Sequence, residues 1–371
     1  MVNNRENPDI ILLVTTCLIV LLGFIIFTSV SMARMAEITE SFEELNLGYF
    51  LFRQFVLGVL PGLLIGFLLY KAKLEHIKKW APVALVINLI VVTMVFIPGL
   101  GQTIRGATRW LSIGGISFQP SEFLKLTFII YLASWLSNRT VKDDNRLFSE
   151  TLLAFGAVCV LISGLILLQR DLSTLIVIMA SGFMMYFTYR TPLSHILLLI
   201  IGGVAGLASF IALFPYRLER VKDLLGSITD PEGVSYQAQQ ALLAIGSGGL
   251  FGLGFGVGHQ KYGFLPFAMS DSIFAAYAEE AGFIGSLLLI LLFLIFAWRG
   301  VKIAKRNKDS FFSLMAVGIS FWIFFQAFVH IGSMVGILPV TGIPLPFVSH
   351  GRAHFIAELA AVGILLNISK S

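Results

Sequence analysis

The sequence predicts an all-α polytopic membrane protein, and its composition carries most of that prediction. Hydrophobic residues make up 57% of the 371 residues, glycine adds another 35, and charged residues amount to only 13%. Soluble globular proteins contain about 45–50% apolar residues with glycine included, and about 25% charged residues. The mean hydropathy is +0.88. So few charged side chains cannot cover a soluble surface, and the chain is therefore expected to lie in a lipid bilayer.

The apolar residues are also gathered into runs of the length that crosses a membrane, which is about 20 residues for a helix. No soluble domain, low-complexity linker or solenoid repeat separates them, so a single membrane domain over residues 1–371 is expected. About ten transmembrane helices are predicted, at 10–33, 49–70, 80–97, 121–137, 151–168, 172–189, 193–214, 273–298, 310–335 and 346–368.

The basic residues predict the orientation of these helices. With the N-terminus in the cytoplasm, 15 of the 26 lysines and arginines fall in cytoplasmic segments and eight fall outside. Four of those eight lie in one long loop, where the preference of basic residues for the inside is weak. Both termini are therefore expected in the cytoplasm. Because the basic residues form short clusters between apolar runs, the +5 net charge indicates membrane topology and not nucleic-acid binding.

Two further features exclude other classes of protein. Cys17 and Cys159 are the only cysteines and lie in apolar runs, so neither a disulfide framework nor a cysteine-based metal site is expected. The first apolar run follows a polar start whose one basic residue is Arg5, and it is long enough to span. No cleavable signal is therefore expected.

A large extracytoplasmic loop, about 215–272, is predicted between helices 7 and 8. Its glycines between Gly246 and Gly258 could let backbone N–H groups approach a phosphate. Close helix packing or a flexible re-entrant segment explains the same glycines. The spacing Gly-x-Gly-x-x-Gly does not occur, so a dinucleotide site is not supported.

Asp271 stands where this loop meets an apolar helix, a position at which an ionisable group is costly and indicates a functional site. The alternative is structural, because Ser270 or Asp271 could cap the helix. Glu279 and Glu280 follow two turns later. At least one of them is expected to face the interior with a lysine or arginine partner.

A second group of polar residues precedes the fourth predicted helix. Pro120 fits a first helical turn, and Glu122 and Lys125 are three residues apart on one face, where they can pair. This pair could be a salt bridge with no ligand. In the functional interpretation, Arg109 and Lys125 bind an anionic substrate on the outer face, and Asp171 joins their network.

A third group surrounds the proline-rich segment 338–349, near His330 and Glu358. Irregular backbone at membrane depth is tolerated only where protein buries it or where it lines a cavity. His350 and His354 share a helix face and could in principle bind zinc. Neither a third ligand nor the motif His-Glu-x-x-His is present, so zinc is not expected.

Six motifs spread over the chain together resemble one known family. They are Gly106-Ala-Thr-Arg-Trp110, Phe118-Gln-Pro-Ser-Glu122 with Lys125, Tyr236-Gln237 leading into Ile245-Gly-Ser-Gly-Gly249, Ser270-Asp-Ser-Ile-Phe-Ala275 with Glu279-Glu280-Ala-Gly282, Gly342-Ile-Pro-Leu-Pro-Phe347, and Gly363-Ile-Leu-Leu-Asn-Ile-Ser369. Their combination and order resemble the SEDS family (shape, elongation, division and sporulation), whose members include FtsW, RodA and SpoVE.

The resemblance implies ten transmembrane helices and a peptidoglycan glycosyltransferase in the bacterial cytoplasmic membrane. Such an enzyme polymerises lipid II on the outer face and releases undecaprenyl pyrophosphate. The implied partners are a class B penicillin-binding protein, which supplies transpeptidation, and other membrane proteins of the divisome or elongasome. Tyr236-Gln237 and the ending Asn367-Ile-Ser resemble FtsW-like members, which implies a role at the division septum.

The implied reaction forms a β-linkage from an α-linked donor. Inversion needs a base at the attacking hydroxyl and positive charge at the leaving pyrophosphate. Asp271 matches the family's essential aspartate and is the expected base. The expected substrate-binding residues are Arg109, Glu122, Lys125, Glu279, Glu280, Ser349 and Arg352. A divalent cation, Mg²⁺ or Mn²⁺, could assist at the pyrophosphate, and the sequence leaves the metal requirement open.

The chain departs from the family pattern at several positions. Phe267 stands where a glutamate is usual, His330 where an asparagine is common, and Gln169 where a glutamate begins a further motif. His350, Arg352 and His354 replace a serine-, tyrosine- and glycine-rich stretch. These changes make the outer cavity more basic, which could strengthen anion binding, alter the substrate, or mark a degraded site. The alternatives are an elongation polymerase, a lipid II flippase, since broken helices and buried charges also occur in transporters, and, because of these departures, a catalytically impaired scaffold for a penicillin-binding protein.

Overall fold

The computed structural model describes residues 7–39, 47–104, 107–114, 116–139, 150–189, 192–213 and 235–370. Its helices are α1 (Ile10–Thr39), α2 (Leu47–Gln54), a π-helical turn (Phe55–Val59), α3 (Leu60–Lys71), α4 (Leu74–Met94), α5 (Pro120–Ser137), α6 (Glu150–Leu168), α7 (Leu172–Thr188), α8 (Leu193–Leu213), α10 (Tyr236–Ser247), α11 (Ile273–Arg306), α12 (Ser310–Met334) and α13 (Arg352–Ile368). Its strands are β1 (Gly101–Ile104), β2 (Ala107–Ile113) and β3 (Ile116–Phe118).

Each of the ten predicted apolar segments coincides with helical structure, which confirms a mainly helical membrane protein. Within the described part of the chain, six segments are long and apolar enough to cross a membrane. They are Ile10–Ala33, Leu51–Lys71, Leu74–Met94, Glu150–Leu168, Ile273–Arg306 and Ser310–Met334. The number of ten crossings stays a prediction.

Four predicted boundaries differ from the helix ends by six or more residues, because α1 continues to Thr39, α11 continues to Arg306, and the starts of α4 and α13 also differ. The last predicted helix starts at 346, whereas α13 begins at Arg352. Proline has no backbone N–H to donate to a helix, and the chain around Pro346 instead forms a turn in which Ser349 N donates to Leu345 O at 3.0 Å. Conversely, α4 begins at Leu74, six residues before the prediction, and continues through Pro82.

This mainly helical protein also contains a small sheet, which was not predicted. β1, β2 and β3 form a small antiparallel sheet in that order, with Leu111 opposite both Gly101 and Phe118. Two runs rich in β-forming residues flank Gly114 and Gly115, which is a hairpin signal. Gly114 has φ +59°, a conformation that glycine adopts at little cost. The sheet lies over the start of α5 and carries Arg109.

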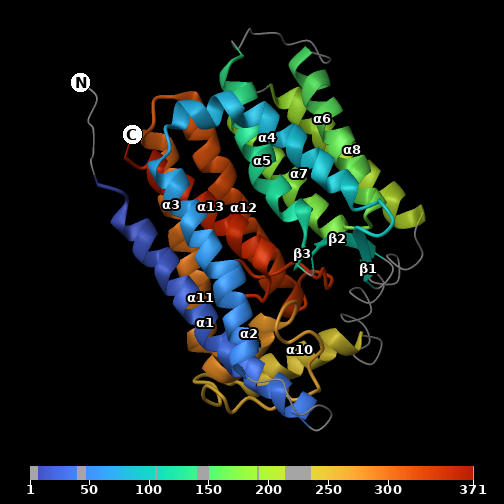
Figure 1. Cartoon of the computed structure of the whole chain (residues 1–371), viewed down its shortest axis with the longest axis vertical. Helices are drawn as coiled ribbons and strands as arrows, with labels where there is room; N and C mark the ends of the chain where they lie inside the picture. The colour runs from blue at the N-terminus through green and yellow to red at the C-terminus, as the bar shows by residue number, and fades with distance from the viewer. Residues whose placement is uncertain are drawn as a thin grey trace.

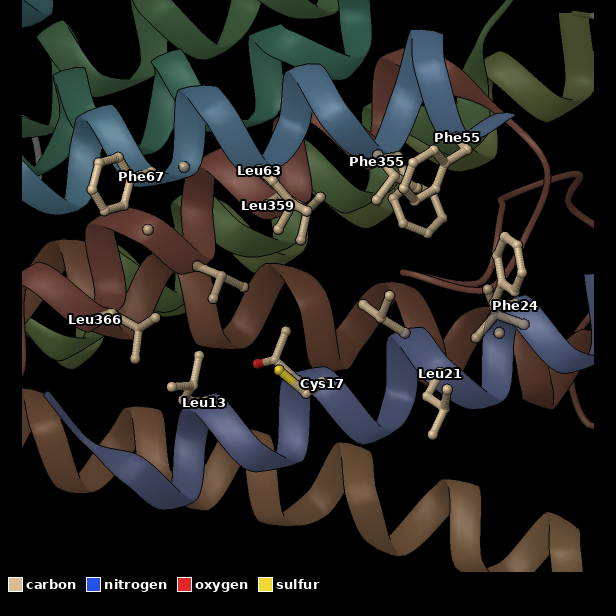
Figure 2. A pocket seen from close by; sticks show the side chains of 18 of the residues that line it. Leu13, Cys17, Leu21, Phe24, Phe55, Leu63, Phe67, Phe355, Leu359 and Leu366 are labelled. Atoms are coloured by element: carbon tan, nitrogen blue, oxygen red, sulfur yellow. The ribbon is translucent and has the colours of Figure 1, made fainter. Parts of the chain in front are cut away.

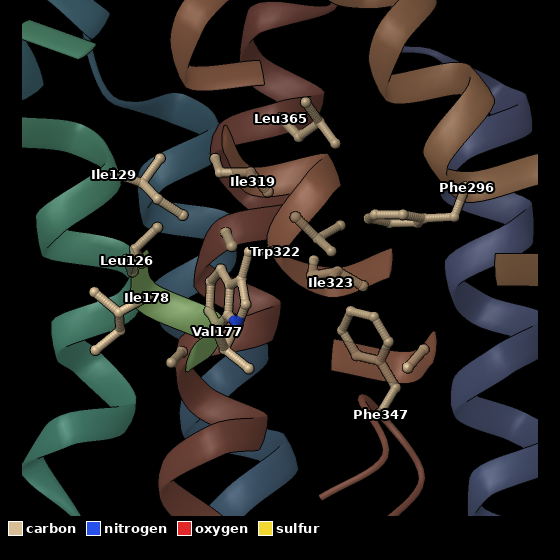
Figure 3. Packing of buried hydrophobic residues seen from close by; sticks show 14 of the residues in the cluster. Leu126, Ile129, Val177, Ile178, Phe296, Ile319, Trp322, Ile323, Phe347 and Leu365 are labelled. Atoms are coloured by element: carbon tan, nitrogen blue, oxygen red, sulfur yellow. The ribbon is translucent and has the colours of Figure 1, made fainter. Parts of the chain in front are cut away.

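α12 is the central helix of the bundle. In its apolar window 67% of the residues are buried, against at most 39% in the other five membrane-length segments. Figure 3 shows Trp322 of α12 surrounded by side chains of α5, α7 and α13. Phe296 of α11 and Phe347 also reach this core, with ring centroids 6.2 Å apart. The core therefore extends up to the loop that follows α12.

The two ends of the chain lie at the same end of the bundle (Figure 1). Asp9 forms an ion pair with Arg299 near the end of α11, and its backbone N–H donates to Ser369 Oγ at 2.9 Å. The sheet and α10 lie toward the opposite end of the bundle. The described residues next to the two termini therefore lie away from the sheet and α10.

α11 contains a break at Gly282, where φ is +67°. The glycine-rich segment that follows α10 fills this break. Leu253 N and Gly254 N donate to Glu279 O and Glu280 O, both at 3.0 Å, and Phe283 N donates to Gly249 O at 2.9 Å. A Cβ atom on Gly252 would lie 2.1 Å from Glu280 O. Gly252 therefore serves close packing, the alternative to a phosphate-binding segment, as does Gly248, whose added Cβ atom would lie 2.1 Å from Ala278 O.

The large outer loop is described only from residue 235 onward. Its first described part is α10, a short helix that was not predicted. The part of the predicted loop before residue 235 lies outside the described residues, as does Gly106 of the first family motif.

Candidate active site

Asp271 lies in the turn that leads into α11, and it is half-buried. The N-cap position of α11 is Ser272, whose side chain makes no capping bond to the helix. Ser272 Oγ instead donates to Pro266 O at 2.7 Å and accepts from Gln237 Nε2 at 3.1 Å. α10 and the preceding turn thus hold the chain beside Asp271.

Asp271 faces the loop between α12 and α13, here called the α12–α13 loop (335–351). A Cβ atom on Gly342 would lie 3.5 Å from Asp271 Oδ2. Two hydrogen bonds join the flanking segments, because Ser349 Oγ donates to Ser270 O at 2.7 Å and His350 N donates to Met269 O at 2.8 Å. The two motifs that the sequence analysis singled out separately therefore form one structure.

Of the network suggested for Arg109, Lys125 and Asp171, the structure brings Arg109 and Asp171 together, whereas Lys125 pairs with Glu122. Arg109 Nη1 lies 3.5 Å from Asp171 Oδ1, and the side chain of Arg109 is 31% exposed whereas that of Asp171 is 2% exposed. Asp171 caps α7 by accepting from Thr174 N, and it accepts from Gln119 Nε2 at 2.9 Å. The carboxylate is thus fixed inside the protein, while the side chain of Arg109 is partly exposed.

The α12–α13 loop also contacts the start of α7, two residues after Asp171. Ser173, in the first turn of α7, donates a hydrogen bond to Thr341 O. Thr341 directly precedes Gly342, which faces Asp271. The Arg109–Asp171 pair and Asp271 therefore flank the same stretch of backbone.

The predicted pair between Glu122 and Lys125 is present, with 2.6 Å between Oε2 and Nζ. Both side chains are buried, at 4% and 3% exposed. Lys125 Nζ also donates to Gln326 Oε1 at 2.9 Å and lies over the Trp322 ring. The ammonium group is thus directed into the protein, behind the α12–α13 loop.

Glu279 and Glu280 point toward the segment 258–261. Glu279 accepts from His259 N at 2.8 Å and from Gln260 N at 3.2 Å. Glu280 has the basic partner that was expected, because Lys261 Nζ lies 2.5 Å from Glu280 Oε1. Neither carboxylate is open to the outside, since both residues are 1% exposed.

Ser349 and Arg352 also make internal contacts. Ser349 is fully buried and accepts from Leu345 N at 2.8 Å, in addition to its bond to Ser270. Arg352, the first residue of α13, donates from Nη2 to Ser117 O at 3.0 Å. Arg352 therefore joins the start of α13 to strand β3.

His350 and His354 have separate partners. The ring of His350 stacks on Phe27 at 5.5 Å, whereas His354 Nε2 lies 3.1 Å from Ser349 O. A Cβ atom on Gly351 would lie 2.4 Å from the His354 ring, so this close approach requires glycine. The described residues contain no group of three or more His, Cys, Asp or Glu side chains placed to hold a metal ion.

Gln326, Ser29 and Lys261 belong to these networks but were not predicted as site residues. Gln326 contacts Lys125 and Pro344, and Ser29 Oγ donates to Glu280 Oε1 at 2.7 Å. A single glutamine in an otherwise apolar run was the available signal for Gln326, because polar side chains within membrane helices usually have partners. No comparable local signal marks Ser29 or Lys261.

An apolar groove of about 650 Å³ runs along α1, α3 and α13 (Figure 2). Leu13, Leu63 and Leu366 are among the side chains that line it. None of its lining residues is an aspartate, glutamate, lysine, arginine or histidine. The groove therefore differs from the polar cluster around Asp271, which contains ionisable side chains.

The chain is similar to known proteins over nearly its whole length. The family described as cell cycle protein (FtsW/RodA/SpoVE) matches residues 9–371. Stage V sporulation protein E of Bacillus subtilis (strain 168) is 35% identical over 100% of this chain and 99% of its own length. A probable peptidoglycan glycosyltransferase FtsW of Allochromatium vinosum is 38% identical over 93% of this chain and 86% of its own.

Two solved structures share the fold. A chain from a structure describing how a peptidoglycan synthase complex coordinates polymerization and crosslinking has a TM-score of 0.78 and 26% identity, over 98% of both chains. The rod shape determining protein RodA of Thermus thermophilus has a TM-score of 0.70 and 27% identity, over 99% of this chain and 98% of its own.

Proposed function

The chain belongs to the FtsW/RodA/SpoVE family of cell cycle proteins, and from that membership we propose that it is a peptidoglycan glycosyltransferase acting on lipid II, with Asp271 as its general base. Relatives named as FtsW glycosyltransferases cover most of the chain at 32–38% identity. The observation that carries the assignment of the site is the position of Asp271 opposite Gly342 in the α12–α13 loop. The same loop contacts Ser173 at the start of α7, where Asp171 pairs with Arg109.

The proposed reaction is a direct displacement with inversion. The carboxylate of Asp271 takes the proton of the acceptor sugar hydroxyl, whose oxygen attacks the anomeric carbon of the donor. The bond to the pyrophosphate breaks, and undecaprenyl pyrophosphate leaves with the bonding electrons. Positive charge placed at the departing oxygen stabilises the transition state. Arg109 is the proposed source of this charge, because its side chain is 31% exposed whereas that of Lys125 is 3% exposed.

The other expected site residues take indirect parts in this proposal. Their polar atoms are committed to contacts inside the protein, so they shape the site without reaching the substrate in this arrangement. This assignment covers Glu122, Lys125, Glu279, Glu280 and Ser349. Arg352 holds β3 against α13 and so supports the strand layer that carries Arg109. A divalent cation at the pyrophosphate stays part of the proposal, with no protein ligands assigned.

We further propose that the chain works with a class B penicillin-binding protein. The solved relative with a TM-score of 0.78 comes from a peptidoglycan synthase complex that couples polymerization to crosslinking. The present chain would supply polymerization, and a transpeptidase partner would supply crosslinking. FtsW-like relatives support a place at the division septum. Basic residues are in excess in the segments at the end of the bundle where both termini lie, and this excess supports cytoplasmic termini.

The test is a polymerization assay with purified protein, a class B penicillin-binding protein and labelled lipid II, with products separated on a gel. We expect glycan strands from the wild type and none from Asp271→Asn. Asp309→Asn is the matched control, because Asp309 caps α12 by accepting from Phe311 N, at the end of that helix away from the α12–α13 loop.

The alternatives give different results in the same assay. Equal polymer from Asp271→Asn and the wild type would remove Asp271 as the base. No polymer from the wild type with any transpeptidase partner would favour a scaffold. Transfer of lipid II across vesicle membranes without polymer would favour a flippase.

A further inference from the structure

Three buried side chains of α12 and α13 form hydrogen bonds with the backbone of the α12–α13 loop. His330 Nδ1 lies 2.6 Å from Ile343 O, and Gln326 Nε2 donates to Pro344 O at 3.0 Å. Glu358 Oε2 accepts from Phe347 N at 2.8 Å. All three side chains belong to residues that are at most 1% exposed. These three residues are called the anchor residues below.

The orientation of the Gln326 amide is fixed by its surroundings. Its oxygen accepts from Lys125 Nζ at 2.9 Å and from Trp322 Nε1 at 2.8 Å. With two donors at the oxygen, the amide nitrogen must face Pro344 O. Lys125 therefore acts on the loop through Gln326, and this contact gives the buried ammonium group a function that does not need substrate.

The same loop is fixed on its outer side by the segment that carries Asp271. Ser349 and His350 bond to the backbone of Ser270 and Met269. Phe347 has φ +61°, which is an unfavourable conformation for a residue with a side chain, and its ring is fully buried. Strained backbone of this kind persists only where its surroundings fix it, and it often occurs at functional sites.

We propose that Gln326 and Glu358 are positioning residues for Asp271, with Lys125 acting through Gln326. They fix the position of the backbone of residues 342–347. This position in turn sets the distance between the Asp271 carboxylate and the backbone at Gly342 opposite it. The inference rests on the proposed function, because it explains how the proposed base is held. It assigns no contact between either residue and the substrate.

The variants are Glu358→Leu, which removes the acceptor for Phe347 N, and Glu358→Gln, which keeps an acceptor oxygen. Gln326→Leu tests the second anchor. The matched control is Asn367→Leu. Asn367 lies on the same helix as Glu358, is 8% exposed, and donates to Leu69 O and Ala72 O at the other end of the bundle.

Two measurements are made on the full chain with its transpeptidase partner. The first is the kcat and KM of lipid II polymerization. The second is hydrogen–deuterium exchange in peptides covering residues 342–350, which needs no activity. We expect kcat of Glu358→Leu and Gln326→Leu to fall by about 100-fold, because a displacement of about 1 Å at a catalytic group can cost that much. KM should stay close to the wild-type value, and exchange in 342–350 should become faster.

Glu358→Gln should restore both kcat and protection from exchange, and Asn367→Leu should change neither. Unchanged exchange in Glu358→Leu would overturn the inference, as would an equal loss of kcat in Asn367→Leu. A raised KM with normal kcat would also overturn it, since that result indicates a substrate contact. If the wild type makes no polymer, the proposed function fails, and the exchange measurement still decides whether the anchor residues hold the loop.

Discussion

Oδ2 of Asp271 lies 3.5 Å from the position that a Cβ atom on Gly342 would occupy, and Gly342 has φ +70°. A methyl group at this position makes an ordinary contact, so space alone does not require glycine. The backbone conformation does, because the left-handed region costs an L-residue about 1–2 kcal/mol. The backbone opposite the proposed base therefore has a conformation that a side chain at position 342 would disfavour. With a side chain there, we expect this backbone to shift.

Gly342→Ala should lower kcat by about tenfold, which corresponds to a barrier higher by about 1.4 kcal/mol. The physical reason is that the loop relieves the unfavourable φ by moving relative to Asp271. The control is Gly114→Ala, since Gly114 has φ +59° and no atom lies within 4 Å of the position that its Cβ would take. The two variants should lose similar thermal stability, and only Gly342→Ala should lose kcat. Equal kcat losses would contradict this explanation.

Glu280→Gln should strongly destabilise the protein. Lys261 is 1% exposed and Glu280 fully buried in their ion pair, so the substitution leaves a buried ammonium without its countercharge. Removing one member of such a pair typically costs about 3–5 kcal/mol. Thermal unfolding of the purified protein measures the loss, with Glu75→Gln as an exposed control at the start of α4.

The double variant Glu280→Gln with Lys261→Met should recover much of that stability, because it removes both charges at once. Recovery of stability together with polymerization would show that the pair acts in folding. A stable double variant with no polymerization would instead support a substrate-binding role for Lys261 and Glu280.

Gly252→Ala should destabilise the protein more than Gly256→Ala does. Both glycines have positive φ, +81° and +88°, so both variants carry the same backbone cost. Only at Gly252 would the added methyl group meet backbone, at 2.1 Å from Glu280 O, whereas nothing lies within 4 Å at Gly256. Unfolding temperatures of the two variants separate packing from conformational preference. Equal temperatures would argue against the insertion of this segment into α11.

The sequence was sufficient for features that repeat along the chain or lie close together in it. Apolar runs located the helices because each helix must be apolar over its whole length. The Glu122–Lys125 pair followed from a spacing of three residues on one helix. The Arg109–Asp171 contact was also predicted, but from an expected common location on the outer face and not from any periodicity.

Contacts between distant segments could not be predicted in the same way. The partner of Glu280 is Lys261, in a segment whose path depends on the break at Gly282. Gln326 meets Lys125 across 201 positions of sequence, and nothing local to either residue indicates the other. The small sheet was missed because its hairpin signal lay within a loop between strongly apolar helices.

The ion pair between Asp9 and Arg299 predicts a dependence of stability on pH. Burial raises the pKa of the Asp9 carboxyl, but the hydrogen bonds from Arg299 and from the backbone of Leu12, with the charges of Arg299 and Arg306, lower it further, so that the pKa lies below its ordinary value of 3.8. A carboxyl whose pKa is lower in the folded state stabilises the protein at pH values above its unfolded pKa. That contribution is lost as the pH falls below about 3.8 toward the folded pKa.

Asp9→Asn should therefore unfold at a lower temperature than the wild type at neutral pH, and the difference should shrink as the solution becomes acidic. The amide keeps an acceptor for Leu12 N, so the variant removes the charge and preserves most of the geometry. Thermal unfolding of both proteins over a series of pH values gives the difference directly. Because the pair joins α1 to α11, a difference that does not vary with pH would mean that the charge of Asp9 does not hold these helices together.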